Sequence, residues 1–194
     1  VFIIMARDNQ DFEQEFQYFL IIDFEATCDR NRELNPQEII EFPCILLCGK
    51  TLQTIDTFHR YVRPMKHKKL TRFCTELTGI TQDMVNNESM FFDVMEDFLS
   101  WYKKNDLEDK KVAAVTCGNW DLSRMLPMQC QYSEMVIPEY LASSNFINIK
   151  YTFKKMTGKK AEDISSMLNY FGMEFVGRPH AGIDDAKNIA TVLR

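Results

Sequence analysis

The chain has 194 residues, a formal net charge of −5 and 45% hydrophobic side chains, which suits one domain with its own core. A chain of this length buries roughly 70% of its unfolded surface, so folding requires neither disulfides nor a zinc site. No window is long and apolar enough for a membrane-spanning helix, and we expect no membrane partner. The six cysteines include no C-x-x-C pair, which favours buried thiols in a reducing compartment, the cytosol or the nucleus.

The sequence divides into a short leader and one long segment. Residues 1–15 open on the apolar run VFIIM and continue with charged and amide side chains, so we expect an N-terminal extension or an artificial remnant there. Residues 16–194 contain no repeat, no low-complexity tract and no Pro/Gly/Ser-rich linker. We therefore assign residues 16–194 to a single domain.

The first part of that domain predicts three strands. Residues 16–27 form a continuous apolar run rich in aromatic and branched side chains, which is typical of a buried central strand. Residues 41–52 and 54–64 predict two more strands. The short polar junction Gln53–Thr54 between them indicates a hairpin, and hence antiparallel pairing.

Helices and a further strand follow. Residues 74–85 predict short helical turns interrupted at Gly79. Residues 89–104 carry apolar side chains at helical spacing, with Ser89 as the expected N-cap. Residues 111–118 predict a strand.

The last third of the chain predicts helices around one short strand. A helix begins within residues 119–132, and a proline at position 127 is expected to kink or end it. Residues 145–149 predict a strand, residues 163–172 a helix closed by a glycine, and residues 184–193 an amphipathic helix with acidic residues in its first turn. This order predicts an α/β fold in three layers. Its mixed five-stranded sheet has one antiparallel strand and helices on both faces.

Two carboxylates stand near the end of the first predicted strand, in the sequence D-F-E. Asp23 and Glu25 point to one face because side chains alternate along a strand, whereas Phe24 points to the other face. Like charges this close repel each other, and partial burial raises both pKa values. Divalent cations such as Mg²⁺ and Mn²⁺ compensate such a pair because they prefer carboxylate oxygens. The D-F-E pair alone is also compatible with two surface acids at a strand end.

Two further blocks place polar side chains at helix starts. Asp121 follows a strand and a glycine, and the block H-A-G-I-D-D places His180 before the last helix, with Asp184 and Asp185 at its start. Each block alone is compatible with ordinary helix-terminal residues that suit the helix dipole. Together with the D-F-E pair, however, they gather acids and a histidine at strand ends and helix starts, where open α/β sheets bind ligands.

The ordered combination D-x-E … D … H-x(4)-D resembles the DEDDh exonuclease family. Similarity to the branch of enhanced-RNAi and histone-mRNA 3′ exonucleases extends to the blocks FLIIDFEATC, PQEIIEFP, FCTELTGIT, CGNWDL and RPHAGIDDAKNIA. The resemblance runs from about Phe16 to Arg194. It implies an RNase H-like fold and an exonuclease domain over residues 16–194.

The resemblance also implies a reaction. We expect hydrolysis of single-stranded nucleic acid from the 3′ end, with RNA as the preferred partner, to nucleoside 5′-monophosphates. Two divalent cations are expected, Mg²⁺ with Mn²⁺ as a substitute. Asp23, Glu25 and Asp185 would hold one cation, with Asp23 bridging to the second, and Asp121 would act on the second. His180 would be the general base that takes a proton from the attacking water.

Substrate contacts follow from the same resemblance. The ELTGIT segment is similar to the family's wedge at the last base, with Leu77 and Ile80 as apolar contacts. Trp120 is a candidate base-stacking platform, or else a core residue. Backbone groups of Ala26 and Thr27 would face the terminal sugar, and RNA would be favoured over DNA if they bond its 2′-hydroxyl.

Three functions remain open at this point: an RNA exonuclease, a nuclease for DNA or for both nucleic acids, and a catalytically silent module that binds RNA or protein. The five catalytic positions are all filled, which argues against the silent module. The family spacing after His180 selects Asp185, which leaves Asp184 as a helix-cap residue. The basic segment from Arg60 to Arg72 is either a solvated loop or a track for a phosphate backbone. The sequence predicts no particular protein partner.

Overall fold

The computed structural model of the protein describes residues 15–142 and 146–194. Within them one sheet contains six strands: β1 (Tyr18–Ile22), β2 (Glu25–Ala26), β3 (Ile39–Cys48), β4 (Thr54–Tyr61), β5 (Val112–Thr116) and β6 (Phe146–Asn148). The α-helices are α1 (Arg72–Thr78), α2 (Gln82–Asn86), α3 (Phe91–Lys104), α4 (Leu126–Tyr132), α5 (Ile149–Thr157), α6 (Ile164–Tyr170) and α7 (Gly182–Leu193). A π-helical turn η1 (Asp121–Met125) and a 3-10 turn η2 (Glu139–Leu141) complete them. Apart from Glu15, the expected extension over residues 1–15 lies outside the described residues.

Strand β3 runs against all its neighbours in the sheet. It pairs antiparallel with β1, β2 and β4, whereas β5 lies parallel to β1 and β6 lies parallel to β5. The prediction of a mixed sheet with one antiparallel strand is confirmed. The sheet has six strands rather than five because the predicted strand over residues 16–27 divides into β1 and β2.

The division between β1 and β2 falls at Asp23 and Phe24. In β3, residues 44–48 pair with β1 and residues 39–41 pair with β2. Because Ile22 stands opposite Cys44, Pro43 stands opposite Asp23. Proline has no amide hydrogen to give to a strand ladder. The ladder along β3 is interrupted at this point, between β1 and β2.

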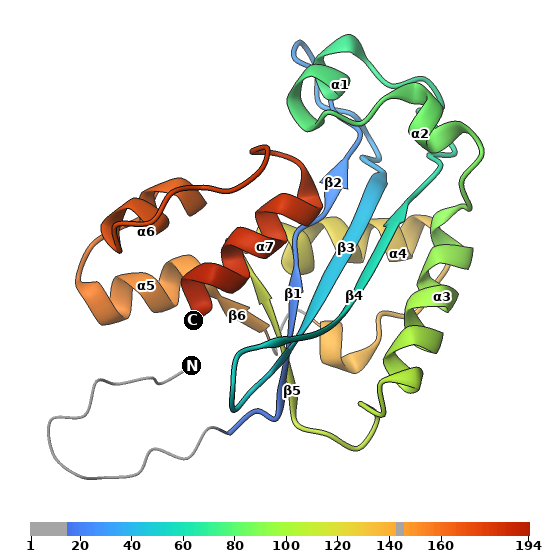
Figure 1. Ribbon diagram of the computed structural model, residues 1–194. Coiled ribbons are helices and arrows are strands. Elements are labelled where there is room, and N and C mark those ends of the chain that lie inside the picture. Colours follow the sequence, from blue (N-terminus) through green and yellow to red (C-terminus); the bar gives the residue numbers. More distant parts are fainter. Residues whose placement is uncertain (1–14, 143–145) are drawn as a thin grey trace, which may run out of the picture.

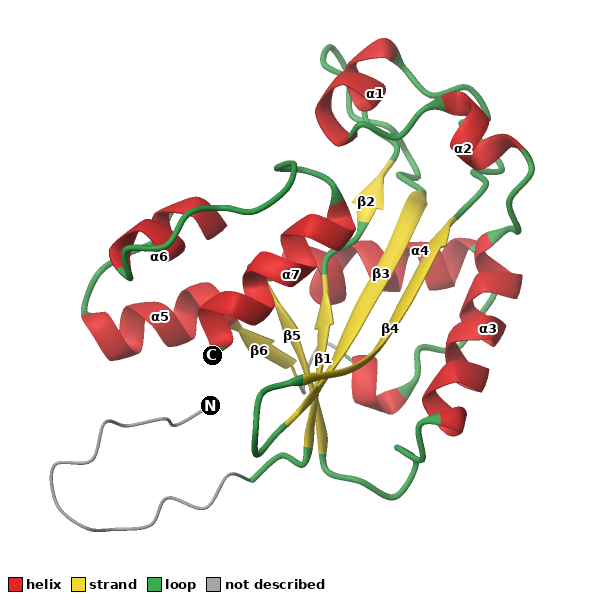
Figure 2. Cartoon of the chain, viewed as in Figure 1, coloured by secondary structure: helices red, strands yellow, loops and turns green. Residues whose placement is uncertain are grey.

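Helices cover both faces of the sheet, as Figures 1 and 2 show. On one face, α3 and α4 pack on a core that includes Leu20 and Ile22 of β1. On the other face, α5, α6 and α7 pack on a core that includes Phe19 and Ile21. The two-residue alternation along β1 therefore supplies both cores. Helices α1 and α2 lie beyond the end of the sheet where β1 gives way to β2 (Figure 1), and the predicted three-layer architecture is confirmed.

Several element bounds differ from the predictions. The turn between β3 and β4 spans residues 49–53, so the hairpin loop is longer than the junction Gln53–Thr54. Helix α3 has Met90 rather than Ser89 at its N-cap position. Helix α7 begins at Gly182, two residues before the expected start. No helix within the described ranges is long and apolar enough to cross a membrane.

Residues 121–132 form one continuous helical unit. The π-helical turn comes first, and the amide of Leu126 donates to the carbonyl of Asp121, five residues back. Pro127 then lies in the first turn of α4, directly after the π-helical turn. The helix continues past Pro127, so the alternative that it ends there is wrong. The irregularity precedes the proline and begins at Asp121.

Helix α5 was not predicted. It begins at Ile149, which the sequence patterns placed in a strand over residues 145–149, and Asn145 lies outside the described residues. The side chain of Asn148 accepts hydrogen bonds from the first amides of the helix and ends β6. Only Ile149 and Phe153 of this helix are buried, so its apolar stripe is too narrow to stand out from the surrounding lysines.

Candidate active site

Three carboxylates converge where β1 ends. Asp23 directly follows β1, Glu25 opens β2, and Asp185 lies in the first turn of α7. One oxygen from each side chain lies within 4.8 Å of the other two. Side-chain alternation brings Asp23 and Glu25 to the α7 side of the sheet, while Phe24 between them enters the opposite core. The structure thus brings together three of the predicted metal ligands, which come from positions up to 162 residues apart in the sequence.

The pKa values of these acids are raised. Burial is the largest cause for Asp23, whose pKa lies well above its ordinary range, and the charges of Asp121, Asp185, Glu25 and Glu41 add to it. Burial followed by the charge of Glu41 raises the pKa of Glu25 to about 9. Burial raises the pKa of Asp185 to about 7 and that of Asp121 to about 6. The cluster is therefore a place where negative charge is costly unless protons or cations compensate it.

Asp121 lies beside this cluster as the first residue of the π-helical turn. Its side chain is buried, 4% exposed, and Oδ1 accepts a 2.9 Å hydrogen bond from the backbone amide of Phe24. Phe24 lies past Ile21, the last residue of β1 that pairs with β5. Within the described residues, no other side chain donates a hydrogen bond to the second carboxylate oxygen of Asp121.

His180 lies on the loop between α6 and α7 and is exposed to solvent, with a backbone φ of 62°. The backbone amide of His180 donates a hydrogen bond to the Asp185 carboxylate. This bond acts against burial, which raises the pKa of Asp185. The imidazole is not among the groups that converge with the acid cluster. The structure therefore joins His180 to the cluster through the backbone of His180.

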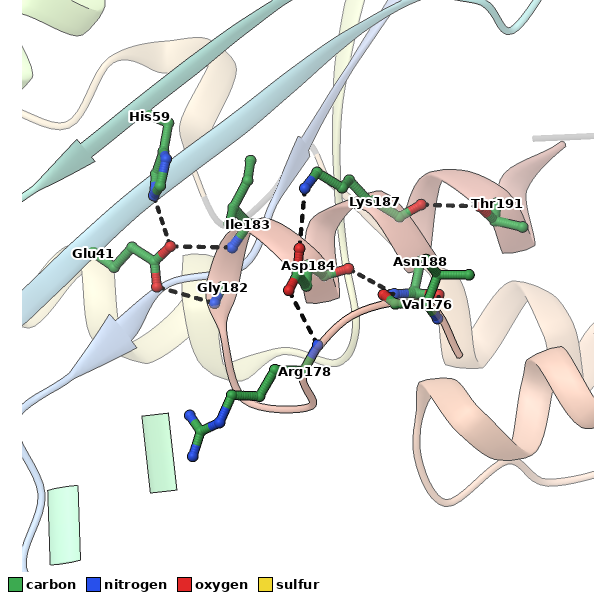
Figure 3. Close-up of polar contacts among 10 residues, drawn as sticks. All are labelled: Glu41, His59, Val176, Arg178, Gly182, Ile183, Asp184, Lys187, Asn188 and Thr191. Carbon is green, nitrogen blue, oxygen red and sulfur yellow. Dashed lines mark hydrogen bonds and ion pairs between the residues drawn. The ribbon is translucent and has the colours of Figure 1, made fainter. Parts of the chain in front are cut away.

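The loop that carries His180 is fastened at several points, some of which Figure 3 shows. The Asn188 side chain accepts the amide of Val176 and donates to its carbonyl. Asp184 accepts the amide of Arg178 at 3.1 Å and pairs with Lys187 at 3.0 Å. The Arg178 guanidinium in turn donates to the carbonyl of Glu76 in α1 at 2.7 Å. The loop is thereby tied both to α7 and to α1.

Glu41 of β3 is a buried acid beside the cluster to which the sequence patterns assigned no role. Its carboxylate accepts the amides of Gly182 and Ile183 at 3.0 and 3.2 Å and the Nε2 of His59 at 2.7 Å (Figure 3). The side chain is 2% exposed. The signal that could have identified it is a charged residue inside an apolar strand, because a buried charge requires partners.

The predicted substrate contacts occupy different environments. Leu77 in α1 is partly exposed, whereas Ile80 is 1% exposed and packs in a small core with Cys74 and Val85. Trp120 is partly buried against the core on the α3 side, directly before Asp121.

Ala26 and Thr27, the predicted contacts of the terminal sugar, are both buried. The amide of Thr27 donates to the carbonyl of Glu38, and its own carbonyl accepts from the Gln37 side chain. Both backbone groups of Thr27 therefore already have partners within the chain. Contact of these two residues with a substrate stays a prediction.

Comparison with known proteins agrees with this arrangement. The family model described as Exonuclease (RNase_T) matches residues 20–193. The chain is 44% identical over 184 residues to ERI1 exoribonuclease 3 of Homo sapiens, which covers 93% of this chain and 54% of that protein. It is 39% identical over 196 residues to 3′-5′ exoribonuclease 1 of Homo sapiens, covering 97% and 55%. The chain spans about half the length of these curated relatives.

Solved structures give the same result. The nuclease domain of 3′hExo, a DEDDh family member, bound to rAMP superposes with a TM-score of 0.86 at 39% identity, covering 92% of this chain and 90% of that one. The 3′-exonuclease in a structure of 3′-end specific recognition of histone mRNA stem-loop superposes with a TM-score of 0.88 at 38% identity, covering 93% and 63%. The chain belongs to the RNase_T exonuclease family, among its DEDDh members.

Proposed function

We propose that this chain is a 3′→5′ exoribonuclease domain that uses divalent cations to hydrolyse single-stranded RNA ends to nucleoside 5′-monophosphates. The observation that carries the proposal is the cluster of Asp23, Glu25 and Asp185, whose carboxylate oxygens lie within 4.8 Å of one another. The exoribonucleases among the relatives support the same activity.

The side chains of the cluster fit Mg²⁺ or Mn²⁺. All the donor atoms are carboxylate oxygens, which these cations prefer, and the raised pKa values of Asp23 and Glu25 mark charges that a cation would compensate. Two bound cations would lower the pKa of a water molecule and stabilise the leaving oxygen. Asp23, Glu25 and Asp185 would hold the first, Asp23 would be shared with the second, and Asp121 would act on the second directly or through water.

His180 is the proton acceptor in this proposal. Its imidazole is exposed on a loop whose backbone already meets the Asp185 carboxylate, which supports this role. Imidazole exchanges protons near neutral pH, and general-base catalysis typically contributes about 10²–10⁴-fold to the rate. A ring nitrogen takes the proton as the water oxygen attacks the last phosphodiester. The phosphorus–oxygen bond to the 3′-oxygen of the shortened chain then breaks.

Substrate contacts complete the proposal. Leu77, which is partly exposed, is the apolar contact of the last base, and Ile80 supports it from the core behind α1. Trp120 offers part of its ring surface beside Asp121, where a base could stack for about 1–3 kcal/mol. Ala26 and Thr27 line the position of the terminal sugar.

The test is incubation with a 5′-labelled single-stranded RNA, because its ladder of shortened products reports the direction of digestion. We expect nucleoside 5′-monophosphates with Mg²⁺ or Mn²⁺ and no digestion with EDTA. A DNA oligomer of the same sequence and a stem-loop RNA, run in parallel, report which nucleic acid and which end structure are preferred.

Asp23→Asn is the matched control because it keeps the shape of the side chain and removes its charge. This variant should lose turnover with Mg²⁺ while its circular dichroism spectrum stays unchanged. Wild-type rates in Asp23→Asn, or digestion of RNA in EDTA by the wild-type protein, would overturn the cation assignment.

A further inference from the structure

The N-terminus of α7 lacks a side-chain cap of its own. Ala181 occupies the N-cap position and offers no side-chain acceptor, although the first amides of a helix have no partner within the helix. Glu41 supplies the missing acceptors from β3, 141 residues earlier in the sequence: Oε2 accepts the amide of Gly182 and Oε1 that of Ile183. A buried carboxylate of the sheet therefore fixes where this helix begins.

We propose that Glu41 is a positioning residue for the reaction, and that His59 holds its carboxylate in place. The proposal rests on the cation-dependent function proposed above. Glu41 secures the first turn of α7 against the end of β1, so that Asp185 within that turn and His180 just before it keep their places relative to Asp23 and Glu25.

The helix and the strand meet with no space to spare. A Cβ atom on Gly182 would lie 2.6 Å from the carbonyl oxygen of Asp23, 3.1 Å from Cγ of Pro43 and 3.2 Å from Oε2 of Glu41. The first turn of α7 can approach Asp23 this closely only because residue 182 is glycine. The contact between Glu41 and Gly182 is therefore made at the same point where α7 touches a predicted metal ligand.

Glu41 is close to the acid cluster but is engaged elsewhere. It stands opposite Glu25 in the register of β2 and β3, and its charge contributes to the raised pKa values of Asp23, Glu25 and Asp185. Both of its oxygens already accept hydrogen bonds from α7, and Oε1 also accepts from His59. The carboxylate thus already holds three donors, two of them from α7, and acts through α7 rather than as a ligand.

His59 completes the arrangement from β4. Its Nε2 lies 2.7 Å from Oε1 of Glu41, and its ring packs edge-on against Tyr61 at 5.1 Å between centroids. Figure 3 shows the imidazole and the amide of Ile183 meeting the same oxygen of Glu41, Oε1, from different directions. With His59 in place, the carboxylate is held toward the amides of Gly182 and Ile183.

The experiment measures Mn²⁺ binding by calorimetry together with kcat and KM on a short single-stranded RNA. Glu41→Gln cannot accept from both amides, so we expect Mn²⁺ affinity and kcat to fall about 10- to 100-fold, the range seen when partners that orient metal ligands are removed, with KM unchanged. Glu38→Gln is the matched control. Glu38 is similarly buried, and its carboxylate likewise accepts backbone amides, those of residues 65–67. That variant should keep the wild-type Mn²⁺ affinity.

Variants of His59 separate position from charge. His59→Leu removes the third donor and leaves the charge of Glu41 in place, so a purely electrostatic role for Glu41 predicts unchanged or tighter Mn²⁺ binding. Positioning instead predicts that Mn²⁺ affinity and kcat fall about tenfold, and that His59→Gln, which restores an N–H donor, recovers them.

Each outcome of these measurements decides a different point. Wild-type Mn²⁺ affinity and kcat in His59→Leu, or equal losses in His59→Leu and His59→Gln, would overturn the positioning role. A wild-type protein that binds no Mn²⁺ would instead overturn the proposed function itself.

Discussion

The backbone amide of Phe24 donates a 2.9 Å hydrogen bond to Oδ1 of Asp121, across 97 residues of sequence. Phe24 lies beyond Ile21, the last residue of β1 that pairs with β5, so no strand partner takes its amide on that side. The bond fixes the first residue of the π-helical turn against the strand that carries Asp23 and Glu25. It occupies one oxygen of a carboxylate whose charge also acts on Asp23 and Glu25.

Two substitutions of Asp121 should therefore differ in stability but not in activity. Asp121→Asn keeps an oxygen that can accept from Phe24, whereas Asp121→Ala leaves that buried amide without its partner. We expect Asp121→Ala to be about 1–3 kcal/mol less stable than Asp121→Asn, which is the usual cost of an unsatisfied buried donor. Urea unfolding without metal measures the difference, and exonuclease assays should find both variants inactive. Equal stability of the two would mean that the Phe24 bond contributes nothing.

The acid cluster predicts an unusual dependence of stability on pH. Burial and the charges of neighbouring acids raise the pKa of Glu25 to about 9 and of Asp185 to about 7, and burial raises that of Asp121 to about 6, whereas the unfolded chain releases these protons near pH 4. Between about pH 4 and pH 9 the folded protein therefore holds more protons than the unfolded one. Its stability should fall as pH rises through this window in the absence of metal.

Urea unfolding in EDTA at a series of pH values measures this trend. Mg²⁺ or Mn²⁺ should remove most of the loss, because cations then replace the protons that compensate the carboxylates. The stabilisation by metal should consequently grow with pH. A metal-free protein that becomes more stable between pH 5 and pH 8 would contradict the raised pKa values.

The sequence was sufficient for the parts of the site that depend on local patterns. Alternation along a strand placed Asp23 and Glu25 on one face and Phe24 on the other, as the structure has them. The patterns that mark a helix start placed Asp121, which follows a strand, and Asp185 correctly at helix N-termini. These predictions hold because they depend on backbone geometry within a few residues.

The parts that depend on contacts between distant segments could not be predicted. A charge inside an apolar strand marks Glu41 as unusual, but its partners come from α7 and β4 only after the chain folds, so no local pattern names them. The split of the strand at Asp23 depends on Pro43 in another strand. Helix α5 was missed because only Ile149 and Phe153 mark its buried side.

Replacement of His180 should alter the pH dependence of the reaction. We expect His180→Ala to lose rate mainly near neutral pH, by about 10²–10⁴-fold, and to recover part of it at high pH, where hydroxide forms without a base. Single-turnover rates with Mn²⁺ between pH 6 and pH 10 measure both profiles. Parallel profiles for the variant and the wild-type protein would exclude a general-base role.

A glycine three residues before His180 offers a test of the loop that carries it. Gly177 has a φ of +96°, and a Cβ atom there would lie 2.5 Å from both Cγ and Oδ2 of Asp184. Gly177→Ala therefore has to displace Asp184 or the loop, and the 3.1 Å bond from Arg178 to Asp184 is lost. Because misplacing a catalytic group by about 1 Å can cost on the order of 10²-fold in rate, kcat should fall sharply.

Gly172→Ala is the control for this substitution. Gly172 has a similar left-handed φ of +72°, but nothing lies within 4 Å of an added Cβ, so both variants bear the conformational cost of about 1 kcal/mol and only Gly177→Ala has the collision. We expect Gly172→Ala to lose stability alone, and Gly177→Ala to lose kcat while its Mn²⁺ affinity, measured by calorimetry, stays near that of the wild-type protein. If the two alanine variants had the same kcat, the position of this loop would not limit the reaction, and His180 would reach its water from a loop that tolerates displacement.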